Sequence, residues 1–381
     1  MSYPTVKLKD ISLIKTGKLD SNAAVTDGVY PFFTCDPTTL RINDWAYDTE
    51  AVLLAGNNAS GNYTAKYYKG KFNAYQRVYI IETADAKRLN IRYLCYAMNQ
   101  QLQLLKTMSS GSTTKFLTLG MLHGLDIPLP VIEEQNSIVA ILSAYDDLIE
   151  NNQKQIKLLE EATQRLYKEW FVDLRFPGHE TTPIVDGVPE GWEIIRFTEI
   201  ASIMSGGTPK TEVKEYYEGD IPFYTPKDSD GSFFTFDTIT HISEDGLAHC
   251  NSQLFPEGTV IITARGTVGK TTILAVPMAM NQSCYALKCD ELNSPYYLFF
   301  SLNKEVDALK TMANGGVFNT IIVKTFDSIN LTVPTRELLS AFDAVVSSIM
   351  EQIKNKMRQN TYLAEARDRL LPKLMSGEIE V

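Results

Sequence analysis

The chain has 381 residues, of which 44% are hydrophobic and 22% are charged, and its formal net charge at pH 7 is −10. This length predicts two or three domains, and the composition is typical of folded globular proteins. The excess of acidic residues argues against a simple basic nucleic-acid-binding protein. The charge is uneven along the chain, however, because residues 1–130 carry a net charge of +4 and residues 177–334 carry −10.

Cysteine and histidine are sparse and scattered. The sequence has five cysteines and four histidines, and no Cys-x-x-Cys pair. This distribution argues against a zinc site and against a disulfide framework. The sequence also lacks a run of about 18 apolar residues and a basic start followed by an apolar stretch. We therefore expect no bound metal, no membrane contact and a cytoplasmic location.

The sequence repeats itself. "GVYPFFTCDP" (28–37) is echoed by "GDIPFYTPKD" (219–228), and "AVLLAGNNASGN" (51–62) by "TVIITARGTVGK" (259–270). From Tyr93, which matches Tyr297, the two copies are 204 residues apart. Units of this size are far longer than the roughly 20–50 residues of a solenoid repeat. The duplication predicts two similar domains, pseudo-two-fold symmetry and a partner that offers two related sites.

Each copy ends in a long stretch whose apolar residues alternate at steps of four and three. The apolar positions are Ile138, Leu142, Tyr145, Ile149, Ile156, Leu159, Leu166 and Trp170, then Phe342, Val346, Ile349, Ile353, Leu363, Leu370 and Leu374. Polar residues occupy the remaining positions of the two series, namely Asn152, Thr163, Lys356, Asn360 and Arg367. This 3.5-residue period predicts a coiled coil. We expect the two helices to pack on each other, with the polar residues fixing their register. Two amphipathic helices lying on their own domains would explain the apolar stripe but not its length.

The stretch from Ala264 to Thr271, "ARGTVGKT", is similar to a phosphate-binding loop. Such a loop needs a strand before it and a helix after it. Here "TVIITA" predicts the first strand, but the β-branched residues and Pro277 that follow predict a second strand. We therefore expect a hairpin whose tip carries Arg265 and Lys270 outward, and a P-loop nucleotide hydrolase is the less favoured alternative. The sequence also lacks a Gly-x-Ser-x-Gly elbow and a methyltransferase signature, so no catalytic residue is predicted.

Four segments carry a family resemblance. "IPLPVIEEQNSIVAIL" (127–142), "LYKEWFVDLRFPG" (166–178), "SGGTPKTEVKEYYEGDIPFYTPKD" (205–228) and "RLLPKLMSGEIEV" (369–381) resemble, in this order, segments of the specificity subunits of type I restriction–modification enzymes. The first copy departs from the pattern, because "KTGKLDSNAAVTDGVYPFFT" (15–34) lacks the Gly-Gly-Thr-Pro sequence. The resemblance nevertheless extends over essentially the whole chain.

The resemblance implies an α+β fold in which two mixed α/β target-recognition domains are separated by two long antiparallel coiled-coil helices. The expected divisions are a first recognition domain (1–130), a first spacer helix (131–176), a linker with the second recognition domain (177–334) and a second spacer helix (335–381). Each domain would recognise one half of a split double-stranded DNA target. Two methyltransferase subunits would bind S-adenosylmethionine and methylate adenine, and restriction or motor subunits would use ATP and Mg²⁺. This chain would bind none of these cofactors and would not be an enzyme.

Phosphate contacts need Lys, Arg and small polar donors, and base recognition needs Arg, Lys, Asn or Gln. The residues that we expect to contact DNA lie in matching loops of the two copies and in the family segment 205–228: Lys66, Lys69, Lys71, Arg77, Ser112, Thr113, Lys115, Lys210, Lys227, Arg265, Lys270, Asn314 and Asn319. A tandem-repeat scaffold whose coiled coil dimerises and whose recognition domains bind protein or glycan is the alternative.

Overall fold

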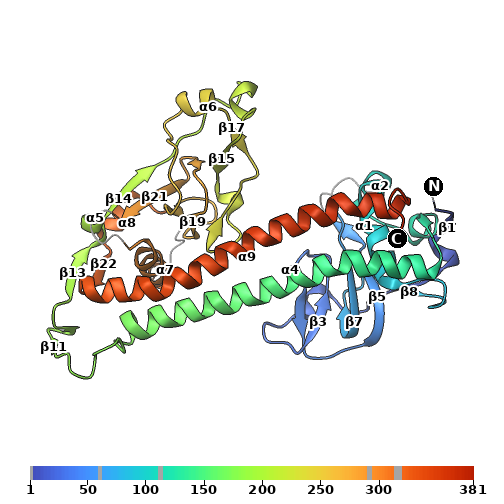
Figure 1. The fold of residues 1–381 in the computed structure, drawn as a ribbon, viewed down its shortest axis with the longest axis horizontal. Coiled ribbons are helices and arrows are strands. Elements are labelled where there is room, and N and C mark those ends of the chain that lie inside the picture. Colours follow the sequence, from blue (N-terminus) through green and yellow to red (C-terminus); the bar gives the residue numbers. More distant parts are fainter. Residues whose placement is uncertain (1–2, 59–61, 110–114, 290–293, 313–319) are drawn as a thin grey trace. The chain divides into compact units, whose positions relative to one another are not determined.

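The structure is a computed structural model, and it describes residues 3–58, 62–109, 115–289, 294–312 and 320–381. Contacts divide the chain into two compact units (Figure 1). The first unit comprises Met1–Glu150 and Thr361–Val381, and the second comprises Asn151–Asn360. Each unit therefore contains one copy of the repeat together with parts of both long helices.

A twisted sheet with the strand order β2-β8-β5-β7-β3-β4 forms the centre of the first unit. Its neighbouring strands are antiparallel except β3 and β7, which are parallel. The strands of this unit are β1 (Thr5–Lys7), β2 (Ser12–Thr16), β3 (Tyr30–Phe33), β4 (Leu40–Ile42), β5 (Tyr47–Ala55), β6 (Asn57–Asn58), β7 (Ala65–Ala74), β8 (Val78–Thr83), β9 (Lys115–Phe116) and β10 (Asp126–Pro128). Its short helices are η1 (Leu8–Asp10), η2 (Ser21–Ala23), α1 (Ile91–Gln100), α2 (Leu102–Met108) and α3 (Leu119–His123).

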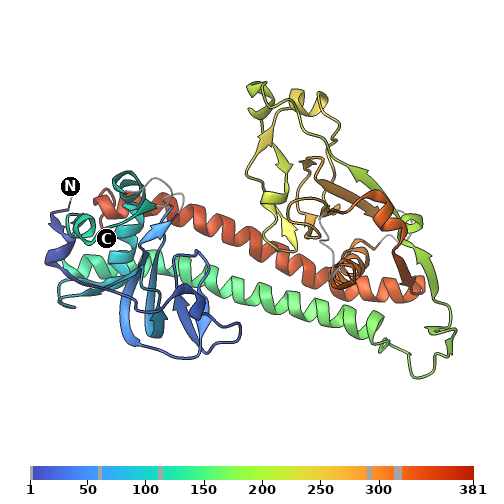
Figure 2. The ribbon, with the colours of Figure 1, turned by 180° about the vertical axis from the view of Figure 1, so that it is seen from behind.

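The central strand β5 is apolar on both faces because both faces of the sheet are covered. Val52 and Leu54 belong to the core cluster that includes α1, whereas Leu53 belongs to a separate cluster with Phe33 and Phe72. Helix α1 packs on β5 and β7 (Figures 1 and 2). A strand that is buried on both faces is expected to be a continuous apolar run, and "AVLLA" is one.

The second unit has the same strand succession but divides it into two sheets, ordered β14-β21-β18-β19-β16 and β17-β15-β20. Its strands are β11 (Ile184–Val185), β12 (Val188–Pro189), β13 (Glu193–Arg196), β14 (Ala201–Ser205), β15 (Ile221–Tyr224), β16 (Phe234–Thr235), β17 (His241–Ile242), β18 (Val260–Thr263), β19 (Thr271–Leu274), β20 (Ala279–Met280), β21 (Cys284–Cys289) and β22 (Asn330–Val333). Its short helices are η3 (Lys168–Val172), α5 (Phe197–Ile200), η4 (Lys214–Tyr217), η5 (Pro226–Asp228), α6 (Glu244–Ala248), α7 (Pro295–Met312) and α8 (Val323–Asp327).

Proline accounts for this division. Strand β7 is continuous in the first unit, but its counterpart is split into β19 and β20, with Pro277 between them. Proline lacks the N–H that a ladder of strand hydrogen bonds requires. Strand β20 pairs in parallel with β15, as β7 does with β3, whereas β16 pairs in parallel with β19.

Two long helices extend through both units: α4 (Ile132–Tyr167) and α9 (Arg336–Ser376). In the first unit, the beginning of α4 shares a core with the end of α9, through Leu142 and Leu374. In the second unit, the end of α4 shares a core with the beginning of α9, through Tyr167 and Phe342. The two helices are therefore antiparallel within each unit, as the resemblance implied.

The predicted seam is confirmed. Every residue of the two heptad series is buried or half-buried in the structure. The amide of Asn152, which is 2% exposed, donates to Gln359 Oε1 and to Asn360 Oδ1, both at 2.9 Å. Thr163 instead satisfies its hydroxyl within α4, on the carbonyl oxygen of Leu159 at 2.6 Å. Asn152 and Asn360 thus link the two helices, as expected of polar residues that specify register.

Among the described residues, every helix is too short or too polar to cross a lipid bilayer.

Candidate nucleic-acid interface

Backbone hydrogen bonds gather four chain segments at one end of the first unit's sheet. The N–H of Gly56 donates to the carbonyl of Arg77 at 2.8 Å, and the N–H of Leu117 donates to the carbonyl of Gly56 at 2.8 Å. The N–H of Tyr75 donates to the carbonyl of Phe33 at 2.9 Å. We call this region the loop end of the unit; it comprises residues 34–39, 56–58, 75–77 and 115–117.

The second unit builds its loop end with the same bonds. The N–H of Ala264 donates to the carbonyl of Ser283 at 2.7 Å, and the N–H of Ile321 donates to the carbonyl of Ala264 at 2.9 Å. The N–H of Asn281 donates to the carbonyl of Tyr224 at 3.0 Å. Each donor and acceptor stands where the repeat places its counterpart in the first unit. This loop end comprises residues 225–230, 264–270, 281–283 and 320–321.

A glycine lets the chain pass closely beside each loop end. A Cβ atom on Gly17 would lie 2.2 Å from the carbonyl oxygen of Ala74, and one on Gly206 would lie 2.2 Å from that of Met280. No other residue fits at either position without a backbone shift. Although the first copy lacks the complete Gly-Gly-Thr-Pro sequence, Gly17 therefore performs the same structural role as Gly206.

Three of the basic residues expected to contact DNA lie at the loop end of the first unit. The ε-amino group of Lys66 donates to Thr39 Oγ1 at 3.1 Å and to the carbonyl of Asp36 at 3.4 Å. Partial burial lowers the pKa of Lys66, and the nearby Asp36 opposes this effect. Arg77 is exposed in the turn after β7. Lys115 is half-buried in β9, where it pairs with Asn58 of β6.

The other two lysines of β7 lie further along the strand. Lys69 forms an ion pair with Glu50 at 3.0 Å. The ammonium group of Lys71 lies 4.5 Å from the centroid of the Trp45 ring. Both side chains are exposed but already have a partner on a neighbouring segment. The structure therefore does not bring them to the loop end, and their contact with DNA stays a prediction.

In the second unit, Lys227 and Arg265 are exposed on adjacent loops of the loop end. The two loops approach each other at Gly266 and Pro226. A Cβ atom built on Gly266 would lie 3.8 Å from the Cβ of Pro226. Lys270 is exposed at the end of the same hairpin loop as Arg265. Lys210 is also exposed, two residues after Thr208, whose hydroxyl donates to Gln282 Oε1. Ser112, Thr113, Asn314 and Asn319 lie outside the described residues.

The segment that is similar to a phosphate-binding loop is a hairpin, as predicted. It joins β18 to β19, which are antiparallel. Thr263 Oγ1 accepts a hydrogen bond from the N–H of Lys270 at 3.0 Å, so the loop closes on its own first residue. Gly266 and Gly269 have φ values of 78° and 77°, which favour glycine. The loop is not followed by the helix N-terminus that would bind a nucleotide phosphate.

A known protein family also matches the two copies of the repeat. A family model described as "Type I restriction modification DNA specificity domain" matches residues 2–161 and 189–359. One match falls on each copy of the repeat, and together they cover most of the chain. The chain belongs to this family.

The relatives of this chain match different shares of it. The type I restriction enzyme EcoDI specificity subunit of Escherichia coli is 32% identical over 228 residues, which are 54% of this chain and 50% of that relative. The HindI specificity subunit of Haemophilus influenzae is 24% identical over 75% of this chain and 76% of the relative. The crystal structure of the S subunit of a type I restriction–modification system from M. genitalium has a TM-score of 0.64 at 17% identity, covering 98% of this chain and 96% of that one. The last comparison supports the fold.

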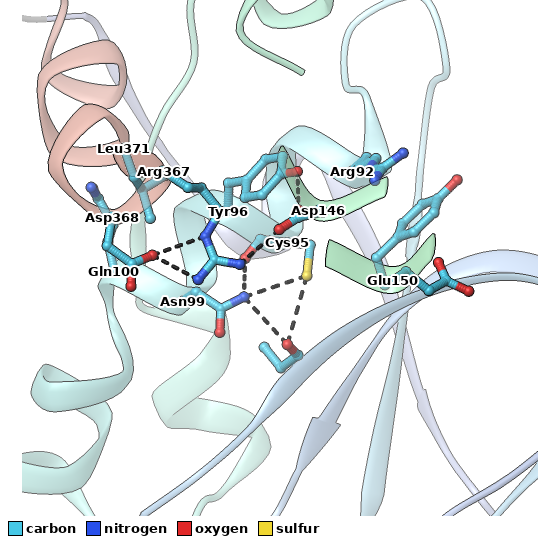
Figure 3. A pocket seen from close by; sticks show the side chains of 12 residues that line it. Arg92, Cys95, Tyr96, Asn99, Gln100, Asp146, Glu150, Arg367, Asp368 and Leu371 are labelled. Carbon is cyan, nitrogen blue, oxygen red and sulfur yellow. Dashed lines mark hydrogen bonds and ion pairs between the residues drawn. The ribbon is translucent and has the colours of Figure 1, made fainter. Parts of the chain in front are cut away.

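A polar cleft of about 530 Å³ lies in the first unit, between α1, β7, α4 and α9 (Figure 3). Asp146 of α4 accepts hydrogen bonds from the hydroxyl of Tyr96 and, at 2.7 Å, from Arg367 of α9. Arg367 also pairs with its neighbour Asp368 at 2.7 Å. Burial, together with the hydrogen bond to Asp146, raises the pKa of Tyr96. This network connects three helices, and we call Tyr96, Asp146 and Arg367 the polar triad.

A cleft of about 580 Å³ occupies the corresponding place in the second unit, between α7, β19 and α4. Three lysines line it: Lys168, Lys270 and Lys304. Lys168 pairs with Asp173 at 2.5 Å, and Lys304 pairs with Glu305 at 3.5 Å. The two clefts thus share their position in the repeat but differ in their side chains.

Sequence reasoning missed two residues that the structure places at the loop ends. Gln76 and Gln282 occupy the same turn in the two copies and are both exposed. The repeat contained the signal, because "YQR" (75–77) aligns with "NQS" (281–283). A single polar residue in a turn has no periodicity, however, and it becomes noticeable only when both turns are seen at the same place.

Proposed function

We propose that this chain is the DNA-recognition subunit of a type I restriction–modification complex and that each copy of the repeat recognises one half of a split target. Residues 1–130 and 177–334 would supply the two recognition domains, and residues 131–176 and 335–381 the spacer helices between them. The observation that carries the proposal is the loop end, which both units build with the same backbone hydrogen bonds. A duplicated structure of this kind suits a ligand with two similar parts, and a double-stranded DNA target in two halves has them.

The side chains at the loop ends suit the two kinds of contact that DNA requires. Lysine and arginine bind phosphate groups, whereas amide and guanidinium groups also recognise base edges. The first loop end presents Lys66, Arg77 and Lys115, and the second presents Lys227, Arg265 and Lys270. The second recognition domain carries a net charge of −10, so its DNA-binding surface is a small basic area within an acidic domain. Partner subunits would therefore supply much of the phosphate contact in that half.

The names of the relatives, which are specificity subunits of restriction enzymes, suggest the partners. In our proposal two methyltransferase subunits and the restriction or motor subunits assemble on this chain. The methyltransferase subunits bind S-adenosylmethionine, and the motor subunits bind ATP and Mg²⁺. The chain itself contributes recognition and no catalytic group. This division of labour agrees with the hairpin at residues 264–271, whose geometry does not suit a nucleotide.

Purification of the tagged chain from its host tests the assembly. We expect an adenine methyltransferase to co-purify, and sequencing of methylated bases in the host genome should reveal a motif in two parts. Deletion of the gene for this chain should abolish that motif. Capture of other proteins without a methyltransferase, and an unchanged methylation pattern after the deletion, would instead support the protein-binding scaffold.

Salt dependence tests the loop end directly. For duplex DNA, the logarithm of the binding constant falls with the logarithm of salt concentration by about 0.9 for each phosphate that the protein neutralises. We expect Arg265→Ala to reduce this slope by about one in the purified complex. Arg369→Ala is the matched control, because Arg369 is also an arginine, is 82% exposed on α9 in the other unit, and pairs with Glu365 at 3.8 Å. Equal slopes for the wild type and both variants would place the phosphate contacts elsewhere.

A further inference from the structure

Two glutamines occupy one position in the two loop ends. Gln76 lies in the turn between β7 and β8, and Gln282 lies in the turn between β20 and β21. In each case the next residue, Arg77 or Ser283, supplies the carbonyl oxygen that holds the neighbouring loop. The backbone of the turn is therefore fixed by its surroundings, while both glutamine side chains remain exposed.

The residues beside the two glutamines differ. Tyr75 and Arg77 flank Gln76, whereas Asn281 and Ser283 flank Gln282. The basic residues around them also stand at different positions, Lys66 and Lys115 in the first copy and Lys227, Arg265 and Lys270 in the second, as expected if the two domains recognise different base sequences. A side chain that both copies retain in such a region suits a feature that both half-sites share.

The carboxamide group indicates what that feature is. It presents one donor and one acceptor in a plane, and this pair matches N7 and the N6 amino group of adenine in the major groove. Guanine presents two acceptors and is matched by arginine or lysine instead. A phosphate group offers acceptors alone and would leave the amide oxygen without a partner.

We propose that Gln76 and Gln282 each recognise an adenine, at corresponding positions of the two half-sites. This inference rests on the proposed function of the chain. The basic residues Arg77, in the first loop end, and Arg265, in the second, lie beside these turns and supply phosphate contacts that hold each turn against the groove. The adenine contact is thus the common element, and the other loops provide the difference between the half-sites.

The two glutamines are positioned differently. The hydroxyl of Thr208 donates to Gln282 Oε1, which orients the amide and leaves its second lone pair for a base. The counterpart of Thr208 in the first copy is Leu19, whose carbonyl accepts from the N–H of Gln76 at 2.9 Å and whose side chain has no donor. Thr208 is accordingly a positioning residue for the second half-site, and the first half-site has no equivalent.

Selection of bound sequences from a randomised DNA duplex, with the complex purified from the host, tests this inference. Gln76→Ala should weaken the preference for adenine at one position of one half-site by roughly 5- to 150-fold and leave the other half-site unchanged. Gln282→Ala should do the same in the other half-site. Thr208→Val should relax the same position as Gln282→Ala, but by less. Gln352→Ala, in an exposed glutamine of α9, is the matched control and should change neither half-site.

The half-site that a variant leaves intact shows that the variant is folded. Weaker binding to every sequence with an unchanged motif would overturn the adenine contact and indicate a backbone contact instead. Relaxation at a base pair other than A·T would overturn it as well. If the wild-type complex selects no motif in two parts, the proposed function fails and this inference fails with it. An intact two-part motif in both glutamine variants would overturn this inference alone.

Discussion

The two units join α4 to α9 with different side chains at the same position. In the first unit the polar triad connects α1, α4 and α9. At the corresponding positions, 204 residues away, the second unit has Phe300, Met350 and Thr163, which are 4%, 0% and 0% exposed. Thr163 bonds within its own helix, and the remaining contacts are apolar. The same backbone arrangement is therefore stabilised by an ion pair in one copy and by packing in the other.

The comparison teaches which property of the repeat is maintained. A partly buried ion pair must recover the cost of removing its charges from water, and packed apolar residues of similar volume often stabilise a protein as well or better. The position of the helices can thus be preserved while the side chains are exchanged. What differs is the surface of the adjacent cleft, which is lined by a carboxylate and arginine network in the first unit and by lysines in the second.

The largest expected effect concerns one core position that is aromatic in the second unit and aliphatic in the first. Phe342 is completely buried, and its ring centroid lies 4.9 Å from that of Phe171. Its counterpart Ile138 is also completely buried. We expect Phe342→Ala to lower the free energy of unfolding by about 3–5 kcal/mol and Ile138→Ala to lower it by about 2–5 kcal/mol. Within these ranges the loss from Phe342→Ala should be the larger, because aromatic pairs add to the effect of burial.

Hydrogen exchange resolved by segment would measure both costs, since each variant should increase exchange mainly in its own unit. Equal losses from the two substitutions would show that the aromatic cluster of the second unit adds nothing beyond apolar burial.

The polar triad should give an intermediate effect. Asp146→Met alone removes the common partner of Tyr96 and Arg367, and hydrogen bonds to charged groups contribute about 1.5–3 kcal/mol. We expect a loss of stability of that order. The triple variant Tyr96→Phe, Asp146→Met and Arg367→Thr, which copies the second unit, should return to within about 1 kcal/mol of the wild type.

Urea unfolding of the three-residue variant and of Asp146→Met alone would decide this. If the triple variant is the less stable of the two, the units are not interchangeable at this position, and the triad has a role that packing does not replace.

The smallest expected effect concerns alkaline pH. The hydroxyl of Tyr67 donates to Glu50 at 2.9 Å, and burial with this hydrogen bond raises the pKa of Tyr67 from 10.0 to about 12. A phenol whose pKa is raised in the folded state contributes stability that is complete below about pH 10 and is lost as the pH rises towards 12. By strand pairing, the counterpart of Tyr67 in the second unit is Ile273, which does not titrate.

Tyr67→Phe should therefore make the stability of the first unit fall less steeply between pH 9 and 11. Urea midpoints at these two pH values measure the slope, and Tyr30→Phe is a suitable control because Tyr30, like Tyr67, is half-buried in a strand of the same sheet. An identical slope in Tyr67→Phe and the wild type would contradict the assignment.

Several elements of the candidate site could be predicted from the sequence. The hairpin at residues 264–271 was predictable because a strand pattern follows the loop directly. The loop ends themselves were predictable from the repeat. The neighbours of the lysines were not, since Lys66 lies against residues 36 and 39, and Lys69 pairs with Glu50 on the adjacent strand. Nothing local in the sequence distinguishes such a lysine from one that projects into solvent.

The sequence alone determined the duplication, the two long helices and the residues of their seam, because heptad spacing and repeated motifs are properties of neighbouring residues. Only the tertiary structure decided which distant residues meet. Asp146 and Arg367 form an ion pair although 221 positions separate them in the sequence. Gly17 is required only because a Cβ atom at this position would lie 2.2 Å from the carbonyl oxygen of Ala74. Likewise, only the matching backbone hydrogen bonds show that Gln76 and Gln282 occupy the same position in the two units. Contacts of this kind depend on chain segments that folding brings together, and local patterns carry no record of them.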